Sequence, residues 1–176
     1  MRVLRYKTKL VNKKAVLVKE SSRNYPDMPR NQFRRSSDVA SFGKGYLHLH
    51  DETEEYIYML CLDTRSRLIA LFEMSHGSVD MSVISPREVF QKALLANASN
   101  IIMLHNHPSG DSQPSVNDIA VTQRLEDTGI IVGIRVVDHV IIGHENCYSI
   151  CEDRYISENN NTNTELEKEN KNDGNP

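Results

Sequence analysis

The stretch that decides the fold is IIMLHNHPSGDSQPSVND, residues 101–118, in which an apolar run ends in two histidines that flank one asparagine. The run from Ile101 to His107 predicts a short strand. Successive side chains of a strand point to opposite faces of a sheet, so residues i and i+2 share a face. We therefore expect His105 and His107 to present both imidazole rings to one point, as two nitrogen ligands of a metal ion would.

A carboxylate follows the two histidines after a loop with proline or glycine at positions 108, 110 and 114, where the chain can reverse. We expect a helix capped by Ser115, with Asp118 in its first turn and its carboxylate aimed back at the strand tip. Zinc accepts such ligands, and three protein ligands leave a fourth position for water. The pair has an alternative explanation, because Ser115-x-x-Asp118 is also a capping pair; both roles can coexist.

Length and composition bound the class of protein. The chain has 176 residues, 39% hydrophobic and 26% charged, as expected for a single catalytic domain with a real core. No signal-peptide core and no run of about 18 apolar residues is present, so we expect a cytoplasmic protein without a membrane segment. Three cysteines (Cys61, Cys147 and Cys151) without a C-x-x-C pair argue against disulfides and a thiolate zinc site.

The charge is unevenly distributed along the chain. Residues 1–35 hold 11 lysines and arginines against two acidic residues, a net charge of +9, whereas residues 36–176 carry −12. A basic segment of this kind is a candidate site for nucleic acid. A solvated strand pair with a lysine-rich outer face explains the same residues equally well.

The remaining pattern predicts strands, helices and three segments of chain. The predicted strands are residues 2–11 and 14–20, joined at Asn12-Lys13, then 56–62, 67–75, 130–137, 139–143 and 147–151. The predicted helices run from Ser37 or Asp38 toward His50, from Ser85 to about Asn100 with a Ser85–Glu88 capping box, and from Ser115 to about Thr128, where Gly129 ends the helix.

The segments are 1–36, a basic strand pair with a linker over 20–36; 37–156, the catalytic domain; and 157–176, an asparagine-rich tail expected to be disordered.

The full spacing is more specific than H-x-H alone. An upstream glutamate, H-x-H, seven residues, Ser, two residues and Asp resemble the motif of the JAMM (MPN-type) metalloproteases. The closer resemblance is to the RadC-like branch, through SHGSVD, SPREVFQKALLANASN, HNHPSGD and DHVIIG, roughly Ser37 to Glu152. It implies an α/β fold with a curved mixed sheet flanked by helices, layered as in cytidine deaminases. It also implies one zinc ion held by His105, His107 and Asp118, and a Ser115 hydroxyl that donates to the attacking water or to the oxyanion.

The upstream glutamate of the family has two candidates in this chain. The family pattern E-x-F-x-V-L-x-L-D is matched by EYIYMLCLD, which begins at Glu55, so we assign Glu55 as the general base. Glu73 is the alternative, although an outward-facing strand position explains it better; Glu52 and Glu54 are expected to be solvated. The implied reaction is hydrolysis of an amide or isopeptide bond by zinc-activated water, with Glu55 carrying the proton to the leaving amine.

The sequence also allows or excludes other functions, and it contains further histidines. The alternative function is a DNA-repair or recombination factor with a structural or vestigial zinc site that binds DNA through residues 1–35. A zinc deaminase of nucleobases is excluded, because its H-x-E and P-C-x-x-C are missing, as is the H-E-x-x-H of helical zinc proteases. Asp138-His139 either orients a ligand or is a packed core pair. Surface positions are expected for the remaining histidines, His48, His50, His76 and His144.

Overall fold

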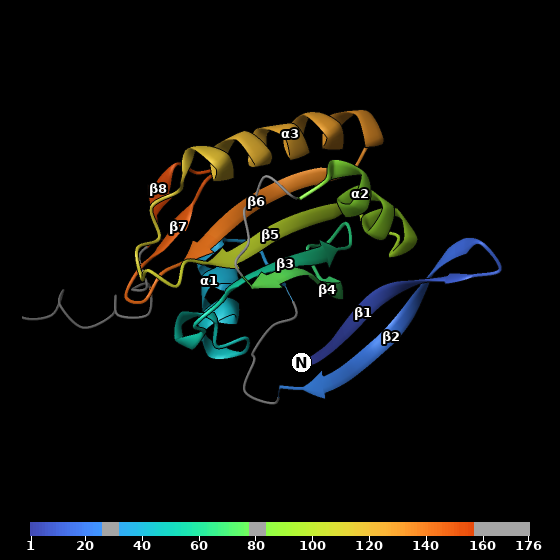
Figure 1. The fold of residues 1–176 in the computed structure, drawn as a ribbon, viewed down its shortest axis with the longest axis horizontal. Helices are drawn as coiled ribbons and strands as arrows, with labels where there is room; N and C mark the ends of the chain where they lie inside the picture. The colour runs from blue at the N-terminus through green and yellow to red at the C-terminus, as the bar shows by residue number, and fades with distance from the viewer. Residues whose placement is uncertain (26–31, 78–83, 157–176) are drawn as a thin grey trace, which may run out of the picture.

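The computed structural model describes residues 1–25, 32–77 and 84–156, and these form one eight-stranded mixed sheet with helices on both faces (Figure 1). The strand order is β2-β1-β4-β3-β5-β6-β7-β8. The strands are β1 (Arg2–Val11), β2 (Lys14–Asn24), β3 (Glu55–Leu62), β4 (Leu68–Gly77), β5 (Asn100–Asn106), β6 (Arg135–Ile142), β7 (Cys147–Ser149) and β8 (Arg154–Tyr155). The helices are α1 (Ser36–Gly45), α2 (Pro86–Leu95), α3 (Val116–Val132) and the short 3₁₀ helix η1 (Leu49–Asp51). The predicted mixed α/β fold is confirmed.

The sheet separates two hydrophobic cores, as the alternation of strand residues requires. Helices α2 and α3 cover one face and α1 covers the other (Figure 1). Along β3, the side chains of Ile57 and Met59 pack in the α2/α3 core, whereas Tyr58 and Leu60 pack in the α1 core. Both faces of the central strands are therefore buried, which explains their continuous apolar runs.

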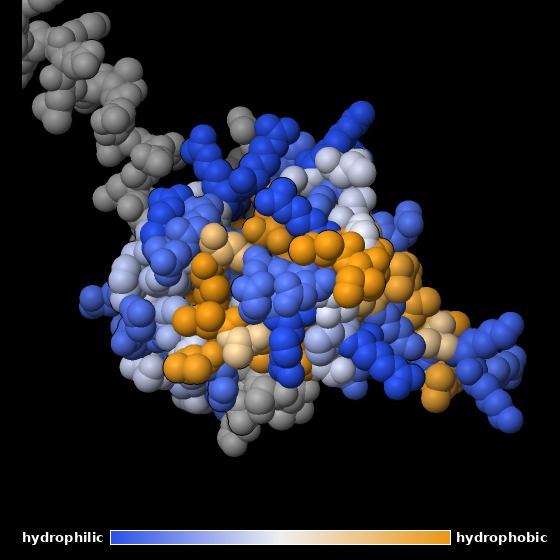
Figure 2. Space-filling model, turned by 90° about the horizontal axis from the view of Figure 1, so that it is seen from above, coloured by the Kyte–Doolittle hydropathy of each residue, from blue (hydrophilic) through white to orange (hydrophobic). Residues whose placement is uncertain are grey.

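The outer surface of α2 and α3 carries exposed apolar side chains among charged ones (Figure 2). The most exposed of these are Leu94, Val116, Ile130 and Ile131. None of the helices within the described residues is long and apolar enough to cross a membrane. Two of the three free cysteines, Cys61 and Cys147, are buried in the core, as expected from their apolar surroundings.

The N-terminal hairpin continues the central sheet. Asn12 and Lys13 form its turn with φ of 51° and 63°, the left-handed conformation that two-residue hairpin turns require. Strand β1 pairs in parallel with β4, where Arg5 lies opposite Leu71. The predicted loop over 20–36 is wrong at its start, because β2 extends to Asn24 along β1; residues 26–31 and the predicted tail 157–176 lie outside the described part.

Helix ends differ from the predicted ones in α1 and α2. The N-cap of α1 is Arg35, and Asp38 accepts a hydrogen bond from its backbone N–H at 3.0 Å, so neither Ser37 nor Asp38 is the cap. The helix also stops at Gly45, before η1. In α2 the cap position is Ser85 as predicted, but the capping box with Glu88 does not form, and the helix ends at Leu95 because left-handed backbone follows at residue 97.

Helix α3 is longer than its sequence indicates. It continues through Gly129 to Val132 and ends at Gly133, whose φ is 77°. Gly129 stays within the helix, and its missing side chain makes room for Ile134: a Cβ there would lie 2.5 Å from the Ile134 carbonyl oxygen. The predicted strand over 130–137 is accordingly wrong in its first half, and β6 begins at Arg135.

Candidate metal centre

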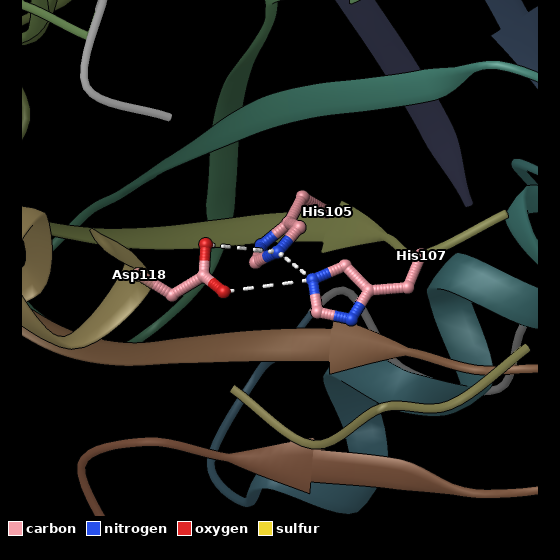
Figure 3. Close-up of side chains that lie close together, drawn as sticks. All are labelled: His105, His107 and Asp118. Carbon is pink, nitrogen blue, oxygen red and sulfur yellow. Dashed lines mark hydrogen bonds and ion pairs between the residues drawn. The ribbon is translucent and has the colours of Figure 1, made fainter. Parts of the chain in front are cut away.

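Two imidazole rings meet at the carboxyl end of β5. His105 lies within the strand and is fully buried, and His107 follows one residue after its end. The backbone at His107 is still paired with β6, because its N–H donates to the carbonyl of Ile142 at 3.0 Å. The two residues therefore share a face as predicted, and their Nε2 atoms lie 3.0 Å apart (Figure 3).

The capping box of α3 delivers the carboxylate. The hydroxyl of Ser115 accepts the Asp118 N–H at 3.1 Å, and Asp118 Oδ2 accepts the Ser115 N–H at 2.7 Å. This arrangement fixes the Asp118 side chain in the first turn, where its two oxygens lie 3.5 Å from Nε2 of His105 and of His107 (Figure 3). Capping and proximity to the histidines thus occur together.

The three side chains fit a single metal ion. Their ligand atoms all lie within 4.8 Å of one another. Ligands held about 2.0–2.2 Å from a tetrahedral zinc ion lie about 3.3–3.6 Å from one another. The two Nε2 atoms are 3.0 Å apart, and each lies 3.5 Å from a different oxygen of the Asp118 carboxylate. The Nδ1 atom of His107 is 2.8 Å from the Asp111 carbonyl, to which it must donate, so its Nε2 is the nitrogen directed at the other two ligands.

The pKa shifts leave His105 neutral and Asp118 ionised, as a cation requires, whereas a proton competes with the cation for His107. Burial and the neighbouring ring of His139 lower the pKa of His105 well below its usual value. Burial also acts to lower the pKa of His107, but hydrogen bonds to the Asp118 carboxylate and the Asp111 carbonyl outweigh it, and the pKa is raised. Burial opposes ionisation of Asp118 too, yet the hydrogen bond from His107 holds the pKa of Asp118 well below its usual range. A neutral imidazole, a basic imidazole and a carboxylate thus converge.

Glu55 lies beside this group. Strands β3 and β5 are antiparallel with Ile57 opposite His105, so the same register, two residues further, brings Glu55 to the level of His107. The start of β3 is held there because the Asn106 side chain accepts the Tyr56 N–H at 2.8 Å. The carboxylate of Glu55 contributes to the raised pKa of His107, which agrees with this placement.

Glu73 faces away from the histidines. Strand β4 places it opposite Tyr58, on the α1 side of the sheet. There it pairs with Arg5 at 3.4 Å and with His76 at 2.8 Å, and it lines a cavity of about 450 Å³. On the same side, Glu52 lines that cavity as well. The structure therefore places Glu55, and not Glu73, on the side of the sheet that carries His105, His107 and Asp118.

A further histidine lies behind the group. His139 is fully buried, and its Nε2 lies 2.8 Å from His105 Nδ1, so it is both a packed core residue and a partner of a candidate ligand. Its other nitrogen is 2.6 Å from the hydroxyl of Thr122. The sequence did not indicate Thr122, because a threonine in the second turn of a helix belongs to no recognised motif. Of the four other histidines, His48, His76 and His144 are exposed and His50 is half-buried, largely as predicted.

Comparison with known proteins supports the resemblance. Residues 33–155 match the family model of the RadC-like JAB domain. The chain is 41% identical over 133 residues to a UPF0758 protein of Methanococcoides burtonii, covering 76% of this chain and 57% of that one. It is 46% identical over 113 residues to a UPF0758 protein of Pelobacter propionicus, covering 64% and 49%. The chain spans about half the length of the curated relatives it matches. With a matched family model over more than half of its length, the chain belongs to the RadC-like JAB domain family.

Proposed function

We propose that this protein is a zinc-dependent hydrolase that cleaves amide or isopeptide bonds, with one zinc ion held by His105, His107 and Asp118. The observation that carries the proposal is the convergence of two Nε2 atoms and a carboxylate within 4.8 Å, with a second acid, Glu55, beside them. The distances and the mixed nitrogen and oxygen donor set suit zinc, which commonly takes three such ligands in hydrolases.

Zinc, when bound, would supply Lewis-acid chemistry, lowering the pKa of a water and polarising the scissile carbonyl. The residues of the chain would transfer the protons and stabilise the oxyanion. Glu55 would accept the proton of the attacking water and return it to the leaving amine, a role typically worth about 10²–10⁴ in rate. Ser115 would donate its hydroxyl proton to that water or to the oxyanion; a serine hydroxyl can donate one bond while it accepts the capping N–H.

The first test is metal content and turnover of four proteins: the wild type, His107→Ala, Glu55→Gln and Glu73→Gln. We expect about one zinc per chain in all except His107→Ala. Peptides and isopeptide-linked peptides should be cleaved by the wild type and by Glu73→Gln, whose acid lies on the other face of the sheet. Glu55→Gln should bind zinc and lose turnover. A wild type without zinc after zinc addition, or an active Glu55→Gln, would refute the proposal.

Binding of DNA through residues 1–35 is the weaker alternative. Two cations of the hairpin are already paired, Arg5 with Glu73 at 3.4 Å and Lys7 with Glu20 at 2.7 Å. The acid paired with Arg5 lies outside residues 1–35 and lowers the charge available to a polyanion below the sequence count of +9, whereas Glu20 is already included in that count. If the protein binds nucleic acid equally well before and after its zinc is removed, this alternative is favoured over the hydrolase.

A further inference from the structure

A series of hydrogen bonds connects His105 to Asp118 through two buried residues, Thr122 and His139. Thr122 lies one turn after Asp118 in α3, and its hydroxyl is 2.7 Å from the Asp118 carbonyl oxygen and 2.6 Å from His139 Nδ1. His139 Nε2 is in turn 2.8 Å from His105 Nδ1. Thr122, His139 and His105 are all buried, so water does not compete for these bonds.

The positions of the protons along these hydrogen bonds follow from the one bond whose direction is fixed, between the Thr122 hydroxyl and the Asp118 carbonyl oxygen. A backbone carbonyl can only accept, so the Thr122 hydroxyl donates its single proton to Asp118. The hydroxyl oxygen must then accept from His139, whose Nδ1 carries the proton. Both nitrogens of the fully buried His139 ring are engaged by neutral groups, the Thr122 hydroxyl and the His105 ring, so a charge on it would be buried without a counter-charge and the ring stays neutral. Its Nε2 is therefore an acceptor, and the donor facing it is His105 Nδ1–H.

We propose that Thr122 and His139 are positioning residues that hold His105 as the Nδ1–H tautomer, so that its Nε2 lone pair is directed at Asp118 and His107. The series of hydrogen bonds ends at the backbone of Asp118, the residue that also supplies the carboxylate. Strand β5, strand β6 and the first turn of α3 are thereby linked in one ring of contacts around the site. The inference rests on the proposed function for the identity of the metal, and on the hydrogen bonds and the burial of His139 for the order of the protons.

The second histidine provides an internal comparison. His107 is held in the same tautomer by a separate bond, from its Nδ1 to the Asp111 carbonyl at 2.8 Å. Nothing in that bond involves Thr122 or His139. A change at Thr122 should therefore alter the protons of His105 and leave those on Nδ1 of His107 in place.

Three threonine variants separate the role of the hydroxyl from helix stability. Thr122→Val removes the hydroxyl and keeps the shape, whereas Thr122→Ser keeps the hydroxyl. Thr128→Val is the matched control, because the Thr128 hydroxyl makes the same bond to the carbonyl four residues earlier, Arg124 at 2.7 Å, but that bond is exposed and Thr128 itself is only half-buried. Loss of a partner behind a metal ligand typically lowers metal affinity about 10–100-fold.

The experiment measures zinc affinity by competition with a chelator, together with ¹⁵N NMR of the imidazole rings in metal-free protein at neutral pH. We expect Thr122→Val to bind zinc about 10–100-fold more weakly, while Thr122→Ser and Thr128→Val stay close to the wild type. The NMR spectrum of the wild type should show a proton on His105 Nδ1, and that of Thr122→Val a mixture of tautomers with His107 Nδ1 still protonated.

Wild-type affinity in Thr122→Val, or a proton on His105 Nε2 in the wild type, would overturn the inference. The wild-type spectrum decides the second point even if Thr122→Val fails to fold. Absence of zinc binding in the wild type would instead refute the proposed function, and the spectrum would still test the order of the protons.

Discussion

Asp118 has two roles in the structure, and replacing it with alanine removes both. Its Oδ2 accepts the Ser115 N–H at 2.7 Å and so caps α3. Its two oxygens also lie 3.5 Å from the Nε2 atoms of both histidines. Asp38 occupies the same position in α1 and has the capping role only, accepting two backbone N–H groups at 2.9 and 3.0 Å. Asp38→Ala is therefore a matched control for the loss of the cap.

The two variants should differ in their response to zinc. Loss of capping interactions costs about 0.5–2 kcal/mol of the free energy of unfolding in either variant. Zinc at about 100 times its dissociation constant should add about 2.7 kcal/mol to the stability of the wild type. At about 2–4 °C per kcal/mol for a chain of this size, zinc should raise Tm by about 5–11 °C. Asp118→Ala, with one of three protein ligands removed, should keep little of this rise.

The assay is thermal unfolding by circular dichroism before and after zinc is added to chelator-treated protein. Without zinc, both variants should melt below the wild type. With zinc, Asp38→Ala should gain as many degrees as the wild type and Asp118→Ala should gain almost none. An equal gain in the two variants would show that the Asp118 carboxylate contributes only the cap, and the ligand assignment would be wrong.

Three further predictions follow from single residues. Zinc must displace a proton from His107, whose pKa is raised, so the apparent zinc affinity should fall about tenfold for each pH unit below that pKa in calorimetric titrations. Gly129→Ala should destabilise the protein by about 1–3 kcal/mol because its Cβ would meet a backbone oxygen at 2.5 Å, whereas Gly45→Ala, with open space around it, should be neutral or stabilising in urea unfolding. Lys13→Gly should raise the free energy of unfolding by up to about 1 kcal/mol, because φ is 63° there; a loss of stability would contradict this account of the turn.

The parts of the fold and site that could be predicted from sequence are those whose signals are local. The shared face of His105 and His107 follows from the alternation of a single strand. The Ser115–Asp118 box follows from four consecutive residues at the start of one helix, and the structure contains both of its hydrogen bonds. Each signal lies within a few residues and needs no knowledge of what packs against it.

Gly129 shows where a local signal fails. Glycine after an amphipathic run ordinarily ends a helix, since it adopts left-handed backbone without strain. Here the glycine that does so is Gly133, and Gly129 stays helical because its carbonyl accepts the N–H groups of both Gly133 and Ile134 as the chain folds back over it. Only the path of the chain after the helix distinguishes the two glycines.

Thr122 and His139 could not be joined from sequence for a related reason. Thr122 is an ordinary helix residue four positions after Asp118, and His139 is a polar residue in an apolar strand. Their 2.6 Å contact exists because α3 lies across β6, which brings together residues 17 positions apart. The partner that directs the proton on His105 is thus a consequence of packing between elements.

The choice between Glu55 and Glu73 depends on strand pairing in the same way. Both acids belong to strands of apolar residues, and alternation within one strand says only which residues share a face. Because Ile57 lies opposite His105, Glu55, two residues earlier on β3, is on the histidine side of the sheet. Glu73 lies opposite Tyr58, which is one residue out of phase with Ile57 and packs toward α1. A shift of one residue between β3 and β5 would turn Glu55 to the α1 face, so the register of that pair, rather than the chemistry of either carboxylate, decides which acid can reach the metal group.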